Sequence, residues 1–78
     1  LPEYYTVIVT NNDEFLFVLE HLYKGDEKCY RNGFKECAEN GVYYIGNSNS
    51  GWFYNYKNNH KQNPEITFEQ FKKYVLNK

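Results

Sequence analysis

The last part of this chain carries a complete helix start, which constrains the fold more than any other segment. Thr67 can cap a helix, and Gln70 follows three residues later to complete a capping box. Phe68, Phe71 and Val75 then recur at the i, i+3, i+7 spacing of a single apolar stripe. The segment is therefore predicted to form a helix that buries one face against the rest of the chain.

A strand followed by an amphipathic helix is predicted for the first third of the chain. Residues 4–10 are rich in β-branched and aromatic side chains, which is typical of a strand. Alternation assigns three of them to the core face: Tyr5, Val7 and Val9. Residues 11–14 supply an N-cap and an acidic first turn, and the helix is predicted to run to about Lys24, with Gly25 just beyond it. Its apolar stripe is the strongest in the chain and consists of Phe15, Val18, Leu19 and Leu22.

The polar segment 26–41 admits two interpretations, a short helix or an irregular strand. In the helical interpretation one face carries Phe34, Cys37 and Ala38, and the helix ends at residues 40–41. The glycine content of the segment is equally compatible with irregular backbone. Both interpretations therefore stay open at this point.

The second half of the chain predicts a hairpin, a loop and the closing helix. Residues 42–46 and 51–56 are rich in aromatic side chains and predict two antiparallel strands joined by a turn at 47–50, and a polar loop follows at 57–64. The predicted fold is α+β, a three-stranded antiparallel sheet with two helices packed on one face, in a single domain over residues 1–78. We expect the apolar helix residues to be largely buried against the first strand: Phe15, Leu19, Leu22, Phe68, Phe71 and Val75.

The closing run ITFEQFKKYVL at residues 66–76 resembles the C-terminal helix of a family of small accessory domains encoded by bacteriophages and mobile elements, mostly without an assigned function. The leading strand, the first helix and the Tyr-rich hairpin fit the same pattern, whereas residues 26–41 depart from it. The resemblance implies an accessory protein that acts in the cytoplasm of an infected bacterium on host machinery or host defence, including CRISPR systems. The chain has no methionine, so we expect it to be trimmed or cut from a longer protein.

Charge and hydropathy argue against several classes of protein. The net charge of −1 gives no overall field that would attract nucleic acid or an anionic membrane. Residues 1–39 hold 8 acidic and 4 basic side chains, and residues 40–78 hold 2 acidic and 5 basic ones, so the second half is mildly basic. No apolar run approaches the length of about 18 residues that a membrane span requires.

Cysteine and histidine, the residues that most often bind metals or act as nucleophiles and bases, are few in this sequence. Cys29 and Cys37 lie eight residues apart without a C-x-x-C pair, and His21 and His60 are the only histidines, so we expect no metal and no cofactor. Two reduced thiols are favoured over a Cys29–Cys37 disulfide. Cys37 has acidic Glu36 beside it rather than a basic partner that would activate a thiolate. The sequence therefore predicts a protein that is not an enzyme.

The hairpin and the loop after it are the predicted contact surface. Trp52, Tyr54 and Tyr56 share one face of the third strand, and we assign Trp52 to the core. Either Tyr43 or the pair Tyr54 and Tyr56 is expected on the solvent side, a choice that the pattern leaves open. The full set of predicted contact residues comprises Tyr43, Tyr54, Tyr56, Lys57, His60 and Lys61, with a second set around Arg31 and Lys35.

The predicted function is to bind a host macromolecule and block or recruit it, and the favoured partner is a host protein. Tyrosine-rich surfaces suit this role because each ring supplies a large contact area at low entropic cost. One alternative is a single-stranded nucleic-acid binder, since aromatic rings beside Lys57, His60 and Lys61 can stack on bases and meet phosphates. Another is a structural module of a larger phage protein. We expect a monomer or a weak homodimer.

Overall fold

The computed structural model describes residues 1–22, 32–38 and 40–77, apart from the side chain of Cys37. A four-stranded sheet and three helices make up the described chain. In chain order the elements are β1 (Tyr5–Val9), α1 (Asn12–Leu22), α2 (Gly33–Cys37), β2 (Tyr43–Ser48), β3 (Gly51–Asn55), β4 (Glu65–Thr67) and α3 (Phe68–Leu76).

The sheet has the order β3-β2-β1-β4, in which β1 pairs antiparallel with β2, β2 antiparallel with β3, and β4 parallel with β1. The α+β class is confirmed, but the prediction of a three-stranded, purely antiparallel sheet is wrong. The residues just before Thr67 are extended and pair with Thr6–Ile8, and the Thr6 amide donates to the Pro64 carbonyl at 3.0 Å. The helix-start pattern therefore overlaps a short strand, β4, which the sequence analysis did not predict.

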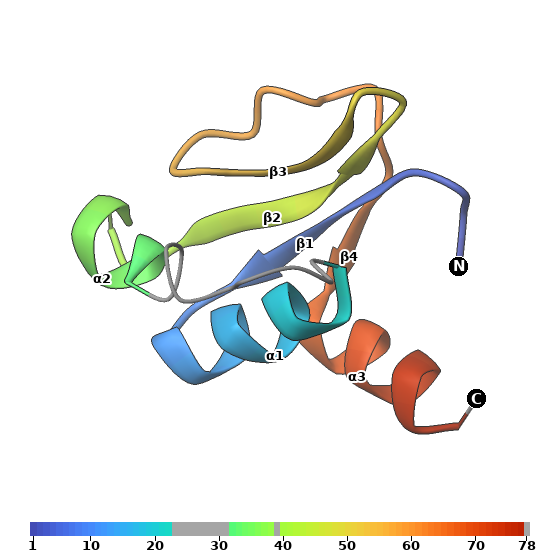
Figure 1. Ribbon diagram of the computed structural model, residues 1–78, viewed down its shortest axis with the longest axis horizontal. Helices are drawn as coiled ribbons and strands as arrows, with labels where there is room; N and C mark the ends of the chain where they lie inside the picture. The colour runs from blue at the N-terminus through green and yellow to red at the C-terminus, as the bar shows by residue number, and fades with distance from the viewer. Residues whose placement is uncertain (23–31, 39, 78) are drawn as a thin grey trace.

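Two helices cover one face of this sheet, as predicted, and the loop of residues 56–64 crosses the other (Figure 1). The helix-side face of the strands carries the buried side chains Tyr5, Val7, Val9, Tyr43 and Ile45. From the helices, Phe15, Leu19 and Phe71 are fully buried, as expected. Leu22, Phe68 and Val75 are only half-buried because they lie at the margins of the core rather than in its centre.

Helix α1 begins with the polar residues that the sequence indicated. The side-chain oxygen of Asn11 accepts a hydrogen bond from the Glu14 amide at 2.9 Å, as an N-cap does. The Glu14 carboxylate in turn accepts from the backbone amide of Thr10 at 2.9 Å. The predicted end of this helix near Lys24 and Gly25 lies outside the described residues.

Within the described part of residues 26–41, helix α2 agrees with the interpretation of a short helix. Phe34 and Ala38 pack against the core, as its predicted apolar face requires. The helix is shorter than expected, because Ala38 already has extended backbone and caps it. The reversal at Asn40 and Gly41, with φ values of 56° and 71°, therefore comes after the helix rather than ending it.

The capping box of α3 is confirmed. The Gln70 amide donates to the Thr67 hydroxyl oxygen at 3.1 Å, and the Thr67 amide donates to the Gln70 side-chain oxygen at 2.9 Å. Both bonds satisfy amides that have no partner within the helix. Thr67 also ends β4, so one residue closes the strand and starts the helix.

Replacing Thr67 by alanine is expected to lower the free energy of unfolding by about 1 kcal/mol, the usual cost of a lost N-cap. Thr67→Ser keeps the hydroxyl and is the matched control, with a loss well below that of the alanine variant. Urea titration followed by circular dichroism measures both. Equal losses in the two variants would mean that the hydroxyl does not contribute to stability.

Candidate functional site

Two of the predicted contact tyrosines belong to the core. Tyr43 is 2% exposed, and its ring centroid lies 5.6 Å from that of Phe15. Tyr54 lies 5.7 Å from Phe15 and 5.7 Å from Tyr43. Trp52 stacks on Tyr54 at 5.5 Å and packs against the core, as predicted. Tyr43 is therefore buried and Tyr54 is partly buried against the core, and the role of either ring as a partner contact stays a prediction.

Strand register explains why these rings share a face. Ile45, which is buried, lies opposite Tyr54 in the β2–β3 ladder. Side chains alternate along a strand, so the neighbours of Ile45 and Tyr54 point to the other side of the sheet. This outer face carries Tyr44 from β2 and Phe53 from β3.

The outer face is covered by the loop of residues 56–64. Strands β3 and β4 form opposite edges of the sheet, so the connection between them must cross one face, and the helices occupy the other. Two residues attach the loop to the sheet. The ring of His60 stacks on Phe53, with ring centroids 3.8 Å apart, and the side-chain amide of Asn63 donates a hydrogen bond to the Asn47 carbonyl at 2.9 Å. His60 is half-buried and holds the loop on the sheet, and its role as a partner contact stays a prediction.

Hydrogen bonds within the loop restrict its backbone. The side chains of Asn55 and Asn58 accept from the amides of Lys57 at 3.3 Å and His60 at 3.1 Å. Two further amides donate to loop carbonyls, Asn59 to Lys57 at 3.0 Å and Asn63 to His60 at 2.9 Å. These short-range bonds are typical of asparagine-rich turns and satisfy polar groups of the loop backbone.

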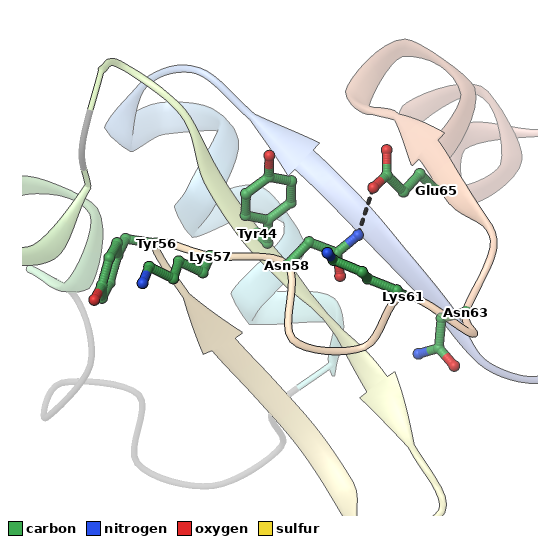
Figure 2. Close-up of a pocket in the computed structure, with 7 residues that line it drawn as sticks. All are labelled: Tyr44, Tyr56, Lys57, Asn58, Lys61, Asn63 and Glu65. Carbon is green, nitrogen blue, oxygen red and sulfur yellow. Dashed lines mark hydrogen bonds between the residues drawn. The ribbon is translucent and has the colours of Figure 1, made fainter.

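An open pocket of about 700 Å³ lies between this loop and the sheet (Figure 2). We call it the loop pocket, and it is lined by Tyr44, Tyr56, Lys57, Asn58, Lys61, Asn63 and Glu65. It contains three of the predicted contact residues, Tyr56, Lys57 and Lys61. Tyr44 was not among the predicted contact residues; it lies on the opposite face of β2 from Tyr43.

The loop pocket has two basic side chains, Lys57 and Lys61, and one acidic side chain, Glu65. Lys57 lies over the ring of Tyr56, with its ammonium nitrogen 5.4 Å from the ring centroid. Within the described chain neither Lys57 nor Lys61 forms an ion pair. The one acidic lining residue, Glu65, accepts a hydrogen bond from the Asn58 side chain, which ties the loop to β4. The pocket therefore presents positive charge to solvent.

The remaining candidate residues lie elsewhere. Lys35 is exposed on α2 and does not line the pocket. His21 packs edge-on against Phe71, with ring centroids 5.3 Å apart. Arg31 and Cys29 lie outside the described residues, as does the side chain of Cys37, so the predicted state of the thiols stays a prediction.

Over residues 1–22, 32–38 and 40–77, no group of three potential ligands from His, Cys, Asp and Glu is placed to hold a metal ion. No helix in the same residues has the length and apolar character needed to cross a bilayer. No protein-family model, curated protein or solved structure matches this chain.

Proposed function

We propose that this protein acts by binding, as a non-enzymatic accessory protein of phage type that blocks or recruits a host protein through the loop pocket. One observation carries the proposal. Side chains from β2, the loop and β4 gather around one open pocket, whose two lysines form no ion pair within the residues that the structure describes. The resemblance of the C-terminal helix to phage accessory domains supports a bacterial host as the source of the partner.

The chemistry of the lining favours binding over catalysis. The pocket is lined by tyrosine, lysine, asparagine and glutamate side chains. Nucleophilic catalysis by Ser, Cys or Thr needs a base beside the hydroxyl or thiol, and none of these three residue types lines the pocket. The carboxylate of Glu65 is already engaged by Asn58. These groups suit recognition of a polar surface, in which tyrosines and an asparagine-rich loop supply adaptable contacts.

A protein partner is favoured over a single strand of nucleic acid. Nucleic-acid binders of this kind use exposed rings on which bases stack. Here Phe53 is stacked on His60 and Trp52 on Tyr54, so these rings already have aromatic neighbours. Tyr56 is 39% exposed, but Lys57 lies over its ring.

The test is a pull-down from a bacterial host lysate with the wild-type protein and two variants. The site variant replaces Tyr56, Lys57 and Lys61 by alanine, and the control replaces Lys72 and Lys73, exposed residues on α3. We expect the site variant to lose affinity for its protein partner by about 1–2 kcal/mol, the scale of an interface hot spot, while the control retains it. Melting temperatures should stay within a few degrees because the replaced residues are exposed.

Nuclease treatment separates the two kinds of partner. A captured protein that survives nuclease and is lost only in the site variant supports the proposal. Capture that depends on nucleic acid and falls steeply with salt would favour the alternative, since affinity for single strands declines with a log–log slope of about −0.7 per phosphate neutralised. Equal loss in both variants would show that the loop pocket is not the contact surface.

A further inference from the structure

The two lysines of the loop pocket lie at different places in it. Figure 2 shows Lys57 beside Tyr56 at one end, whereas the side chain of Lys61 extends toward Asn58 near the middle. Tyr44 stands on the sheet between these two regions. Two separated positive charges fit a ligand with more than one negative group, spaced along an extended chain.

We infer that the loop pocket takes an extended acidic segment of the partner protein, in which one carboxylate meets Lys61 beside Tyr44 and a second meets Lys57 beside Tyr56. The inference rests on the proposed function and names the chemistry that the same site recognises. Opposite charges within about 4–6 Å interact favourably, and ammonium–carboxylate hydrogen bonds are stronger than neutral ones. The segment would supply both lysines with the ion-pair partners that they lack in the described chain.

The position of Glu65 determines how the acidic segment is oriented in the loop pocket. Its carboxylate lies on β4, at the far side of the pocket from Tyr56 and Lys57 (Figure 2). An acidic group placed there would be repelled, because like charges at close range oppose each other. The acidic residues of the segment therefore lie toward the lysines, and an amide or a basic side chain of the segment faces Glu65.

Backbone hydrogen bonding in the loop argues for carboxylates rather than phosphates as the preferred anions. Loops that hold phosphate usually aim several free backbone amides at it. Here four loop amides already donate within the loop or to its flanking strand, those of Lys57, Asn59, His60 and Asn63. Two lysines suffice for two side-chain carboxylates, since each ammonium group can donate a charge-assisted hydrogen bond to one of them.

The contacts that hold the loop on the sheet also lower the cost of binding. Ordering a flexible loop on association reduces affinity, whereas a loop already fixed in its bound conformation avoids that loss. This loop is held on the sheet before any ligand binds. The contacts are the hydrogen bonds that the Asn55 and Asn58 side chains accept, the His60–Phe53 stack and the bond from the Asn63 side chain to the Asn47 carbonyl. A short acidic peptide should therefore bind measurably even without the rest of the partner.

The test is a nuclear magnetic resonance titration of the full chain with three probes. These are an acetylated and amidated tetraglutamate peptide, the matching tetraglutamine peptide, and an eight-residue oligothymidylate. We expect tetraglutamate alone to shift the amide signals of Tyr44, Lys57 and Lys61. Lys57→Gln combined with Lys61→Gln should weaken tetraglutamate binding at least tenfold, whereas Lys72→Gln with Lys73→Gln, the same change in charge on α3, should alter it less than twofold.

Several outcomes would overturn the inference. Equal weakening of tetraglutamate binding in both double variants would mean that binding depends only on net charge. An absence of shifts with millimolar tetraglutamate would mean that the loop pocket does not bind acidic segments. Oligothymidylate that shifts the same signals more strongly would assign the site to nucleic acid. The last outcome separates the two proposals. If the alanine variant of Tyr56, Lys57 and Lys61 no longer binds the host protein but the Lys57→Gln, Lys61→Gln variant still does, the proposed function is supported and the inference of an acidic segment is wrong.

Discussion

Replacing Phe71 by alanine is expected to remove about 3–5 kcal/mol of stability, the usual cost of deleting a buried phenylalanine ring. Phe71 has no exposed surface, and its ring centroid lies 5.9 Å from Tyr5 and 6.3 Å from Phe17. Small domains have total stabilities near the lower end of about 5–15 kcal/mol. The variant should therefore be close to unfolded at room temperature.

Leu76→Ala is the control for this experiment, because Leu76 lies on the same helix and is 65% exposed. Its free energy of unfolding should change by less than about 0.5 kcal/mol. Urea titration followed by circular dichroism gives both values. A loss of less than about 1 kcal/mol for Phe71→Ala would mean that α3 does not pack on the sheet as described.

Replacing Gly46 by alanine is expected to cost about 3 kcal/mol, the upper part of the range for overpacking a filled site. A Cβ atom at this position would lie 2.1 Å from the Tyr5 carbonyl oxygen and 3.0 Å from the Phe53 ring. The oxygen belongs to the backbone of β1, so it cannot move without disturbing the sheet. The clash also lies under the loop, so the loop pocket should lose its shape together with stability.

Gly41→Asn provides a contrast, because Gly41 has a φ of 71° and open space around its Cβ position. Asparagine tolerates left-handed backbone better than most residues, so this variant should lose less than about 1 kcal/mol. Thermal unfolding of the two variants beside the wild type measures the difference. Similar melting temperatures for both variants would contradict the close approach of β1 to Gly46.

Local patterns were sufficient for most of the elements but not for the sheet as a whole. The cap at Thr67 and the apolar stripes of α1 and α3 depend on neighbours a few residues away, and the sequence displays such neighbours directly. Strand β4 has three residues and owes its existence to pairing with β1, a segment near the other end of the chain. No periodicity can develop over so short a length.

The same distinction holds for the site. Tyr56, Lys57 and Lys61 were predicted because a polar loop after an aromatic strand is visible in the sequence. Tyr43 and Tyr44 are adjacent and chemically identical, and a shift of one residue in register exchanges their faces. The buried Ile45 fixes the register, so the alternation of Tyr43 and Ile45 was the signal that could have singled out Tyr44.

The parallel pairing of β1 with β4 also affects how the chain is completed during synthesis. The ribosome produces β1 early, whereas β4 and the Phe71 ring emerge after the whole hairpin and its loop. Until then one edge of β1 has no neighbour, and the core lacks a fully buried ring. Closing contacts over such sequence separations is entropically slow. The fold of residues 1–77 thus stays incomplete until α3 has left the ribosome.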